Sequence, residues 1–178
     1  MNKILIIGIP GSGKSTFANK LGKILDHEVV HLDKLYRKEG WVVAFTKNEW
    51  VELVKNLVSK ERWIMDGNYA GTLDMRLSAA DTVVFLNFNK FVCLYRAWLR
   101  CYKKDLLLGI DKAEGDRNRL SWDLIKKIIT YPKKEILRKL EGVKNEKKVF
   151  VVKNSQEVKI LSIILNKYIF SKLCSKFC

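Results

Sequence analysis

Residues 8–15 carry the side-chain types and spacing of a phosphate-binding loop. They read G-I-P-G-S-G-K-S, which fits the pattern G-x-x-x-x-G-K-[ST]. The glycines allow a tight turn in which backbone N–H groups approach a phosphate, and a following helix would add the positive end of its dipole. The expected nucleotide-binding set is Gly8, Gly11, Ser12, Gly13, Lys14, Ser15 and Thr16.

Within this loop, three side chains have distinct expected tasks. Lys14 would place a positive charge at the β- and γ-phosphates, and the Ser15 hydroxyl would be a ligand of Mg²⁺. Thr16 would cap the helix or touch the α-phosphate. The pattern therefore predicts a site for ATP and Mg²⁺, in preference to an ordinary glycine turn.

Two aspartates are expected beside the loop. Asp33 and Asp66 each follow an apolar run that predicts a strand, at 28–32 and 62–65. In an open α/β sheet, ligands bind beyond the carboxyl ends of the strands, so both side chains should face the loop. Asp66 would organise Mg²⁺ through its water shell, and Asp33 would orient a substrate hydroxyl or accept its proton. The alternative is that either residue only caps a turn or a helix.

Phosphoryl transfer also requires cations over the migrating group. The best candidates are Arg76, Arg96 and Arg100, and the last two are four residues apart on one face of a predicted helix. Arg117 and Arg119 lie in or beside a segment, 103–120, that reads as a mobile loop. For any single arginine, the alternative is a solvated surface charge.

The elements that must position these residues alternate along the chain. Short apolar runs predict five buried strands at 3–7, 28–32, 62–65, 82–86 and 148–152. Helical spacing is expected after the loop, after a capping box at Thr46–Glu49, near 73–77, from 90, after Ser121, after Pro132 and from Ser155. Strands that alternate with helices indicate one α/β domain, 1–178, with a doubly wound parallel sheet.

Composition narrows the class of protein. The 178 residues include 34 Lys+Arg and 19 Asp+Glu, a net charge of +15, which suits nucleotides, nucleic acid or acidic lipid, or else reflects genomic composition. The four cysteines have no metal-binding spacing, so reduced thiols in a cytoplasmic protein are expected. The first apolar run reads as a strand rather than a signal peptide, and no stretch is long enough to span a bilayer. The tail at 167–178 would either touch a membrane surface or form a packed or frayed terminal helix.

Beyond the loop, several segments resemble one family. The chain is similar to the DNA topology modulation (FlaR-type) proteins, which are P-loop proteins of the adenylate-kinase-like class. The matching segments are 6–16 (IIGIPGSGKST), 31–35 (HLDKL) with Gly40-Trp41, 63–69 (WIMDGNY), 72–77 (TLDMRL), 80–82 (ADT), 93–96 (CLYR) and 113–115 (AEG). The resemblance covers roughly residues 3–160, and HLDK together with WIxDGNY is its most specific part.

The resemblance implies a nucleoside-monophosphate-kinase-like fold with strand order 2-3-1-4-5, an acceptor flap at about 34–77 and a lid at about 100–120. It also implies that Asp33, Asp66, Asn68, Tyr69 and Arg76 face the acceptor side. The lid departs from the family. It reads CYKKDLLLG at 101–109, where an arginine-rich segment is expected, and Lys103 and Lys104 lack the planar fork of arginine.

Together these patterns predict an ATP- and Mg²⁺-dependent phosphotransferase that acts on a small acceptor, a nucleotide or nucleoside. Its catalytic set would be Lys14, Asp33, Arg96 and Arg100, with Ser15 and Asp66 at the metal. The alternative is an ATP-binding regulator that associates with DNA through its basic surface, although no DNA-binding motif is visible. A third reading is an interaction module that does not bind ATP. A monomer or a homodimer is expected, and a GTPase is disfavoured because D-x-x-G and N-K-x-D are missing.

Overall fold

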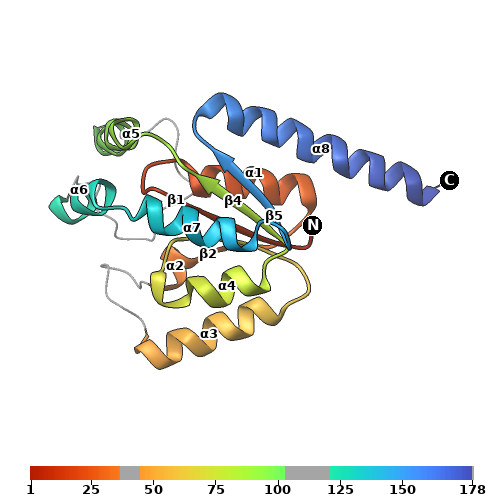
Figure 1. Cartoon of the computed structure of the whole chain (residues 1–178), viewed down its shortest axis with the longest axis horizontal. Coiled ribbons are helices and arrows are strands. Elements are labelled where there is room, and N and C mark those ends of the chain that lie inside the picture. Colours follow the sequence, from red (N-terminus) through yellow and green to blue (C-terminus); the bar gives the residue numbers. More distant parts are fainter. Residues whose placement is uncertain (37–44, 103–120, 178) are drawn as a thin grey trace.

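A five-stranded parallel sheet forms the centre of the molecule (Figure 1). The computed structural model describes residues 1–36, 45–102 and 121–177, with side chains described up to residue 166. The strands are β1 (Lys3–Gly8), β2 (Val29–His31), β3 (Trp63–Asp66), β4 (Thr82–Leu86) and β5 (Lys148–Val152). Their order is β2-β3-β1-β4-β5, which confirms the predicted fold class and strand order.

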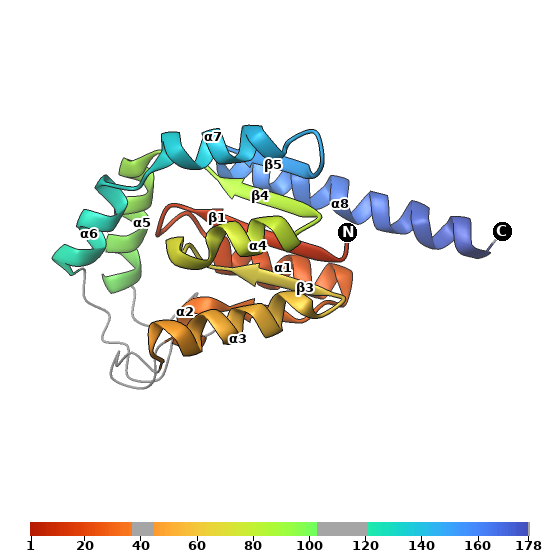
Figure 2. The same ribbon diagram turned by 60° about the horizontal axis from the view of Figure 1, so that its bottom comes forward.

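Helices cover both faces of this sheet (Figure 2). They are α1 (Lys14–Leu25), α2 (Leu32–Tyr36), α3 (Lys47–Ser59), α4 (Leu73–Ala79), α5 (Lys90–Tyr102), α6 (Trp122–Ile129), α7 (Lys133–Val143) and α8 (Ser155–Phe177), with a 3-10 turn η2 (Ala70–Thr72) before α4. Helices α1 and α8 lie on one face and α4 and α7 on the other, with α3 packed beside α4. The end of α8 projects away from the sheet (Figure 1).

The central strands are apolar along their length because both of their faces are covered. Residues 4–7 of β1 and 83–86 of β4 are each at most 1% exposed. Parallel pairing brings the carboxyl ends of all five strands to one edge of the sheet. The loop between β1 and α1 therefore meets the ends of β3 and β4 at that edge.

Two local signals are confirmed in atomic detail. Thr46 accepts a hydrogen bond from the Glu49 backbone and donates its own N–H to the Glu49 carboxylate, which is the predicted capping box. Ser121 accepts from the Leu124 N–H at the start of α6. These contacts form because their partners are three residues away, and so they depend on the local sequence alone.

One strand ends earlier than predicted. The second strand stops at His31, and Asp33 is an exposed residue of the short helix α2. The reason is that β2 is an edge strand with β3 as its neighbour, and His31 pairs with Asp66, the last residue of β3. Beyond that pair the sheet offers no further partner, so the prediction that the strand reaches Leu32 and leads directly into Asp33 is wrong.

Parts of the predicted flap and lid lie outside the described residues. They include Gly40-Trp41 in the flap, and Lys103, Lys104, Arg117 and Arg119 in or beside the lid. The flap and lid boundaries and the single-domain organisation stay predictions. No helix of the described residues is long and apolar enough to cross a membrane.

Candidate functional site

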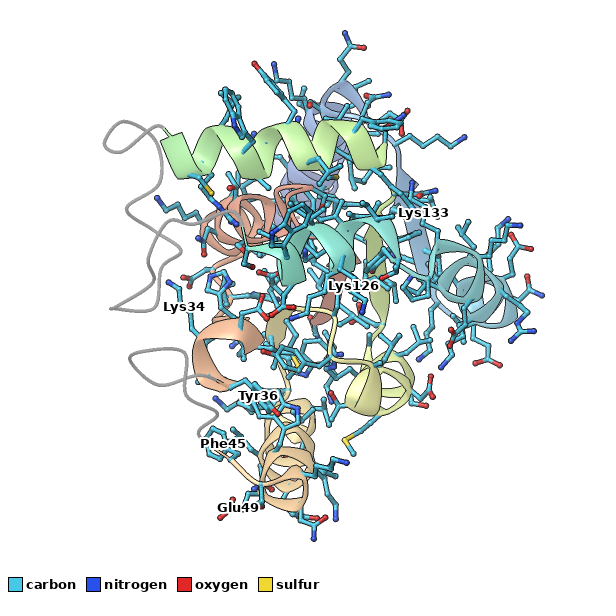
Figure 3. The ribbon with its side chains drawn as sticks, turned by 90° about the vertical axis from the view of Figure 1, so that its left-hand side faces the viewer. Lys34, Tyr36, Phe45, Glu49, Lys126 and Lys133 are labelled. Atoms are coloured by element: carbon cyan, nitrogen blue, oxygen red, sulfur yellow. The ribbon has the colours of Figure 1, made fainter. Side chains whose placement is uncertain are left out.

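The phosphate-loop sequence lies where parallel-sheet topology places a ligand site. Residues 8–15 connect β1 to α1 at the carboxyl edge of the sheet, beside the end of β3. Figure 3 looks onto this edge of the molecule, with Lys34 of α2, Lys126 of α6 and Lys133 of α7 labelled around it. Charged and polar side chains from helices far apart in the sequence thus surround one face.

Two glycines give the loop its shape. Gly11 and Gly13 have φ of 83° and 92°, a left-handed conformation that side chains rarely adopt. A Cβ on Gly11 would also lie 2.6 Å from the carbonyl oxygen of Cys93 in α5, so only glycine lets the loop pack this closely. Helix α1 begins directly afterwards, and its first N–H groups have no partner within the helix. The loop therefore presents backbone donors at a helix N-terminus, which is an anion-binding arrangement.

Lys14 and Ser12 are held inside this loop. The Lys14 side chain is largely buried and its ammonium donates to the Ile9 carbonyl at 3.2 Å. The Ser12 N–H donates to the same carbonyl at 3.1 Å. The buried Ser12 hydroxyl has no hydrogen-bond partner among the described residues. A positive charge and an unused hydroxyl are thus present in the loop.

Ser15 of the loop and Asp66 at the end of β3 are in direct contact. The Ser15 hydroxyl donates to Asp66 Oδ2 at 2.5 Å. His31 Nδ1 lies 3.1 Å from the same oxygen, and His31 Nε2 lies 2.8 Å from Asn19 Oδ1. Asp66 is 3% exposed, and its other oxygen, Oδ1, has no hydrogen-bond partner in the described part of the chain. This unused carboxylate oxygen is where a cation or its water would be accepted.

Asn68 ties the loop to the strand beside it. Its side-chain amide donates to the Gly8 carbonyl at 2.9 Å and accepts from the Gly8 N–H at 3.2 Å. The buried Tyr131 hydroxyl donates to the same Asn68 oxygen at 2.9 Å. Burial raises the pKa of Tyr131, which keeps the hydroxyl protonated and able to donate. In this arrangement the Asn68 amide positions the phosphate loop, while its expected contact with a substrate stays a prediction.

Arg76 is more deeply buried than expected for a side chain that contacts an acceptor. It is fully buried, and each of its three nitrogens donates a hydrogen bond. The acceptors include the carbonyls of Gly67, Asn68 and Tyr69, each within 2.8 Å. Burial lowers the pKa of Arg76 to about 10, so the guanidinium remains charged at neutral pH. The described contacts make Arg76 a support of the turn after β3 rather than a group directed at an acceptor.

The two arginines of α5 are placed differently. Arg96 is partly buried, and it donates to the Ser12 carbonyl at 3.2 Å and to the Ser155 hydroxyl at 2.7 Å. Its guanidinium also lies 4.9 Å from the centre of the Phe88 ring. Arg100, one turn further along, is exposed. The structure therefore brings Arg96 to the phosphate loop and leaves Arg100 at the surface.

Aromatic rings from α2, α3 and the turn after β3 pack together. Trp50 lies 4.8 Å from Tyr36 and 5.1 Å from Tyr69, and Tyr36 lies 4.9 Å from Tyr69, between ring centres. Trp50 is buried, but its indole N–H has no hydrogen-bond partner among the described residues. Figure 3 shows Tyr36 and Phe45 below Lys34 on this face. We call Tyr36, Phe45, Trp50 and Tyr69 the aromatic cluster.

Sequence reasoning missed three residues of the site, namely His31, Asn19 and Tyr131. Two of them had a signal. His31 ends the strand next to the one that Asp66 ends, and Asn19 is four residues after Ser15 on the same helix face. Tyr131 had none, because its contact with Asn68 spans 63 residues.

The residues present fit a nucleotide and a magnesium ion. Mg²⁺ at phosphate-transfer sites is usually held by one or two protein oxygens together with substrate phosphates, rather than by a cage of protein ligands. Ser15 and the unpartnered oxygen of Asp66 supply such oxygens. The described residues contain no group of three or more His, Cys, Asp or Glu that could hold a metal. The Gly11 and Gly13 conformations and the α1 N-terminus fit a phosphate.

Solved structures share the fold. A gluconokinase from Sinorhizobium meliloti 1021 matches with a TM-score of 0.53 and 16% identity, over 96% of this chain and 97% of that chain. A shikimate kinase from Acinetobacter baumannii, solved in complex with shikimate, matches with a TM-score of 0.56 and 18% identity, over 97% of this chain and 94% of that chain. At these identities the similarity establishes the P-loop kinase fold and leaves the reaction open.

Sequence comparison gives a nearer relative. No protein-family model matches the chain. The uncharacterized protein YqaC of Bacillus subtilis (strain 168) is 32% identical over 127 residues, which is 67% of this chain and 69% of that protein. The chain has the P-loop kinase fold and belongs to the same family as the uncharacterized protein YqaC.

Proposed function

We propose that this protein is an ATP- and Mg²⁺-dependent phosphotransferase whose acceptor is a small molecule, a nucleotide or nucleoside. The observation that carries the proposal is the Ser15–Asp66 contact of 2.5 Å beside Lys14 in the phosphate loop. The hydroxyl contacts a carboxylate with an unused oxygen, and the buried ammonium of the same loop lies against the Ile9 carbonyl, at a helix N-terminus. These are the groups that phosphoryl transfer from ATP requires.

Each residue then has a definite task on the ATP side. The loop N–H groups and Lys14 bind the β- and γ-phosphates, and Ser15 and Asp66 hold the magnesium ion. When bound, Mg²⁺ neutralises charge on the phosphate oxygens. Arg96, which donates to the Ser12 carbonyl, is near enough to the loop to stabilise the charge of the transferred group. Arg100, on the next turn of α5, would assist at the surface.

Asp33 and the aromatic cluster form the proposed acceptor side. Asp33 is exposed on α2, where its carboxylate would accept a proton from an acceptor hydroxyl or orient it. Tyr36 and Tyr69 are partly exposed rings beside the buried Trp50. Aromatic faces bind planar rings well, and this supports a nucleotide or nucleoside over a sugar acid as acceptor. Lys34, next to Asp33 and exposed on the same helix, would suit an anionic acceptor.

The FlaR-type resemblance belongs to this proposal too. The segments 31–35 and 63–69, which carry its most specific part, meet in the structure through the pair His31–Asp66. A kinase of this group would turn over, whereas a DNA-associated regulator would bind ATP and release little ADP. The basic composition alone does not favour the regulator, because no described element has a DNA-binding motif.

An acceptor screen tests the proposal. Purified protein with ATP and Mg²⁺ is incubated with nucleoside monophosphates, nucleosides, shikimate and other small alcohols, and acceptor-dependent ADP release is measured. We expect turnover with a base-bearing acceptor, loss of turnover with EDTA, and a higher Mg²⁺ requirement for Asp66→Asn.

Full activity without metal would refute the metal site. Binding of ATP with no acceptor-dependent turnover, together with DNA affinity that survives 0.2 M salt (about physiological ionic strength), would favour the regulator.

A further inference from the structure

His31 is an unassigned part of the site. It ends the edge strand β2, and the strand register places it opposite Asp66. Its side chain is 13% exposed, so the ring is enclosed beside the carboxylate. Neither ring nitrogen faces open solvent, since Nδ1 lies 3.1 Å from Asp66 Oδ2 and Nε2 lies 2.8 Å from Asn19 Oδ1. An unbroken chain of contacts thus runs from Asn19 through His31 and Asp66 to Ser15.

The two carboxylate oxygens of Asp66 differ in their hydrogen-bond contacts. Oδ2 is contacted by both the Ser15 hydroxyl and the His31 ring, while Oδ1 is buried without a hydrogen-bond partner among the described residues. A buried carboxylate oxygen left unpaired is costly unless something binds it. The two oxygens of a carboxylate are chemically equivalent, so a half-turn of the side chain restores the same arrangement, but a smaller rotation would turn the unpaired oxygen away. Two contacts on the other oxygen hold the carboxylate plane against such a rotation better than one.

We propose that His31, held in place by Asn19, is a positioning residue that keeps Oδ1 of Asp66 directed at the divalent cation. The inference rests on the proposed function, because it takes Asp66 as the metal carboxylate. His31 does not itself touch the cation or the nucleotide in this scheme. It acts as an outer partner of a ligating carboxylate, and loss of such a partner typically lowers metal affinity about 10–100-fold.

The position of the contact allows a matched pair of variants. Asparagine at position 31 can place its side-chain N–H near the site of Nδ1 and keep the contact with Asp66. Leucine fills similar space without a donor. His31→Leu should therefore lose the effect, and His31→Asn should restore most of it. His27→Leu is the control, because the His27 ring contacts the Met1 carbonyl and no residue of the site.

The experiment measures metal binding separately from activity. Mn²⁺ is titrated into protein with saturating ADP, and free Mn²⁺ is followed by electron paramagnetic resonance. ADP affinity is measured in EDTA. We expect His31→Leu to weaken Mn²⁺ binding about 10–100-fold while metal-free ADP affinity changes less than about twofold. His31→Asn and His27→Leu should stay within about threefold of the wild type, and Asn19→Leu should weaken Mn²⁺ binding in the same direction as His31→Leu.

The outcomes separate this inference from the function on which it rests. A wild-type protein that binds no Mn²⁺ with ADP overturns both. Normal Mn²⁺ binding in the wild type and in His31→Leu overturns the positioning role alone. An equal loss of metal-free ADP affinity in His31→Leu also overturns it, because the residue would then support the loop and not the carboxylate. If His31→Leu does not fold, Asn19→Leu decides: unchanged Mn²⁺ affinity in that variant counts against the proposal, and weaker Mn²⁺ binding supports it.

Discussion

The two sides of the site hold their polar groups differently. On the proposed donor side, which comprises residues 8–16, Asp66 and Arg96, the side chains of Lys14, Asp66 and Arg96 are buried or partly buried and form hydrogen bonds within the site. On the proposed acceptor side, which comprises Asp33 and the aromatic cluster, the carboxylate is exposed and the rings pack against one another and against the hydrophobic core. The segment 37–44, which belongs to the expected acceptor flap, is outside the described residues.

This difference reflects what each side has to do. A triphosphate and its cation have the same shape in every turnover, so a preorganised set of donors can be built around them at no cost during the reaction. An acceptor must enter and leave, and its binding groups are completed only when it is bound. The donor side should therefore be sensitive to single changes, and the acceptor side more tolerant.

The largest effect is expected at Lys14. Lys14→Ala removes the charge that neutralises the phosphates, so turnover should fall by about 10³-fold or more and ATP binding should weaken. The fold should persist, which circular dichroism and thermal unfolding would show. Lys20→Ala, an exposed position on the same helix, is the control and should leave turnover unchanged. A folded Lys14→Ala protein with normal turnover and ATP affinity would contradict the donor-site assignment.

Arg96 and Arg100 of α5 allow a partly buried arginine at the phosphate loop to be compared with an exposed arginine on the same helix. Arg96→Ala should lower kcat by about 10³-fold, far more than it raises KM for ATP, because the charge acts mainly in the transition state. Arg100→Ala should lower kcat less than about 10-fold, since exposed charges are screened by solvent. Steady-state kinetics with the acceptor found in the screen makes the measurement. Equal effects of the two substitutions would mean that the contacts of Arg96 with Ser12 and Ser155 do not matter for transfer.

Arg76 connects the two sides and should affect stability. Arg76→Leu leaves the carbonyls of Gly67 and Asn68 without their donor and removes one donor from the Tyr69 carbonyl, at a cost of about 3 kcal/mol or more in the free energy of unfolding. Urea denaturation followed by tryptophan fluorescence measures it. Arg138→Leu, on the exposed face of α7, should change the free energy by less than about 0.5 kcal/mol. A stable Arg76→Leu protein that has lost only acceptor affinity would restore the substrate role expected from the sequence.

On the acceptor side, a smaller change than at Lys14 or Arg96 is expected at Asp33. Asp33→Asn should reduce kcat/KM for the acceptor by about 100-fold while ATP affinity stays the same, because the carboxylate serves only the acceptor hydroxyl. Isothermal titration with ATP and acceptor-dependent kinetics separate the two properties. Asp26→Asn is the control, since Asp26 is exposed at the far end of α1 and asparagine tolerates its left-handed backbone. Unchanged acceptor kinetics in Asp33→Asn would show that Asp33 has no role at the acceptor.

Much of the donor side could be predicted because its signals are local. The spacing of Gly11, Gly13 and Lys14 specifies a loop whatever surrounds it, and apolar runs bounded by polar residues specify buried strands. The cap at Thr46 likewise depends on a residue three positions away. The acceptor side was harder to predict, because Asp33 lies in a helix that the sequence pattern did not indicate.

The sequence by itself determined the phosphate loop, the alternation of strands and helices and the presence of an acid after each of two apolar runs. Only the tertiary structure decided which side chains meet: His31 with Asp66, Asn68 with Gly8, and Arg76 with three carbonyls of one turn. The physical reason is that the first two contacts depend on strand order and register between distant segments. The third depends on how deeply α4 packs against the sheet, which no local pattern records.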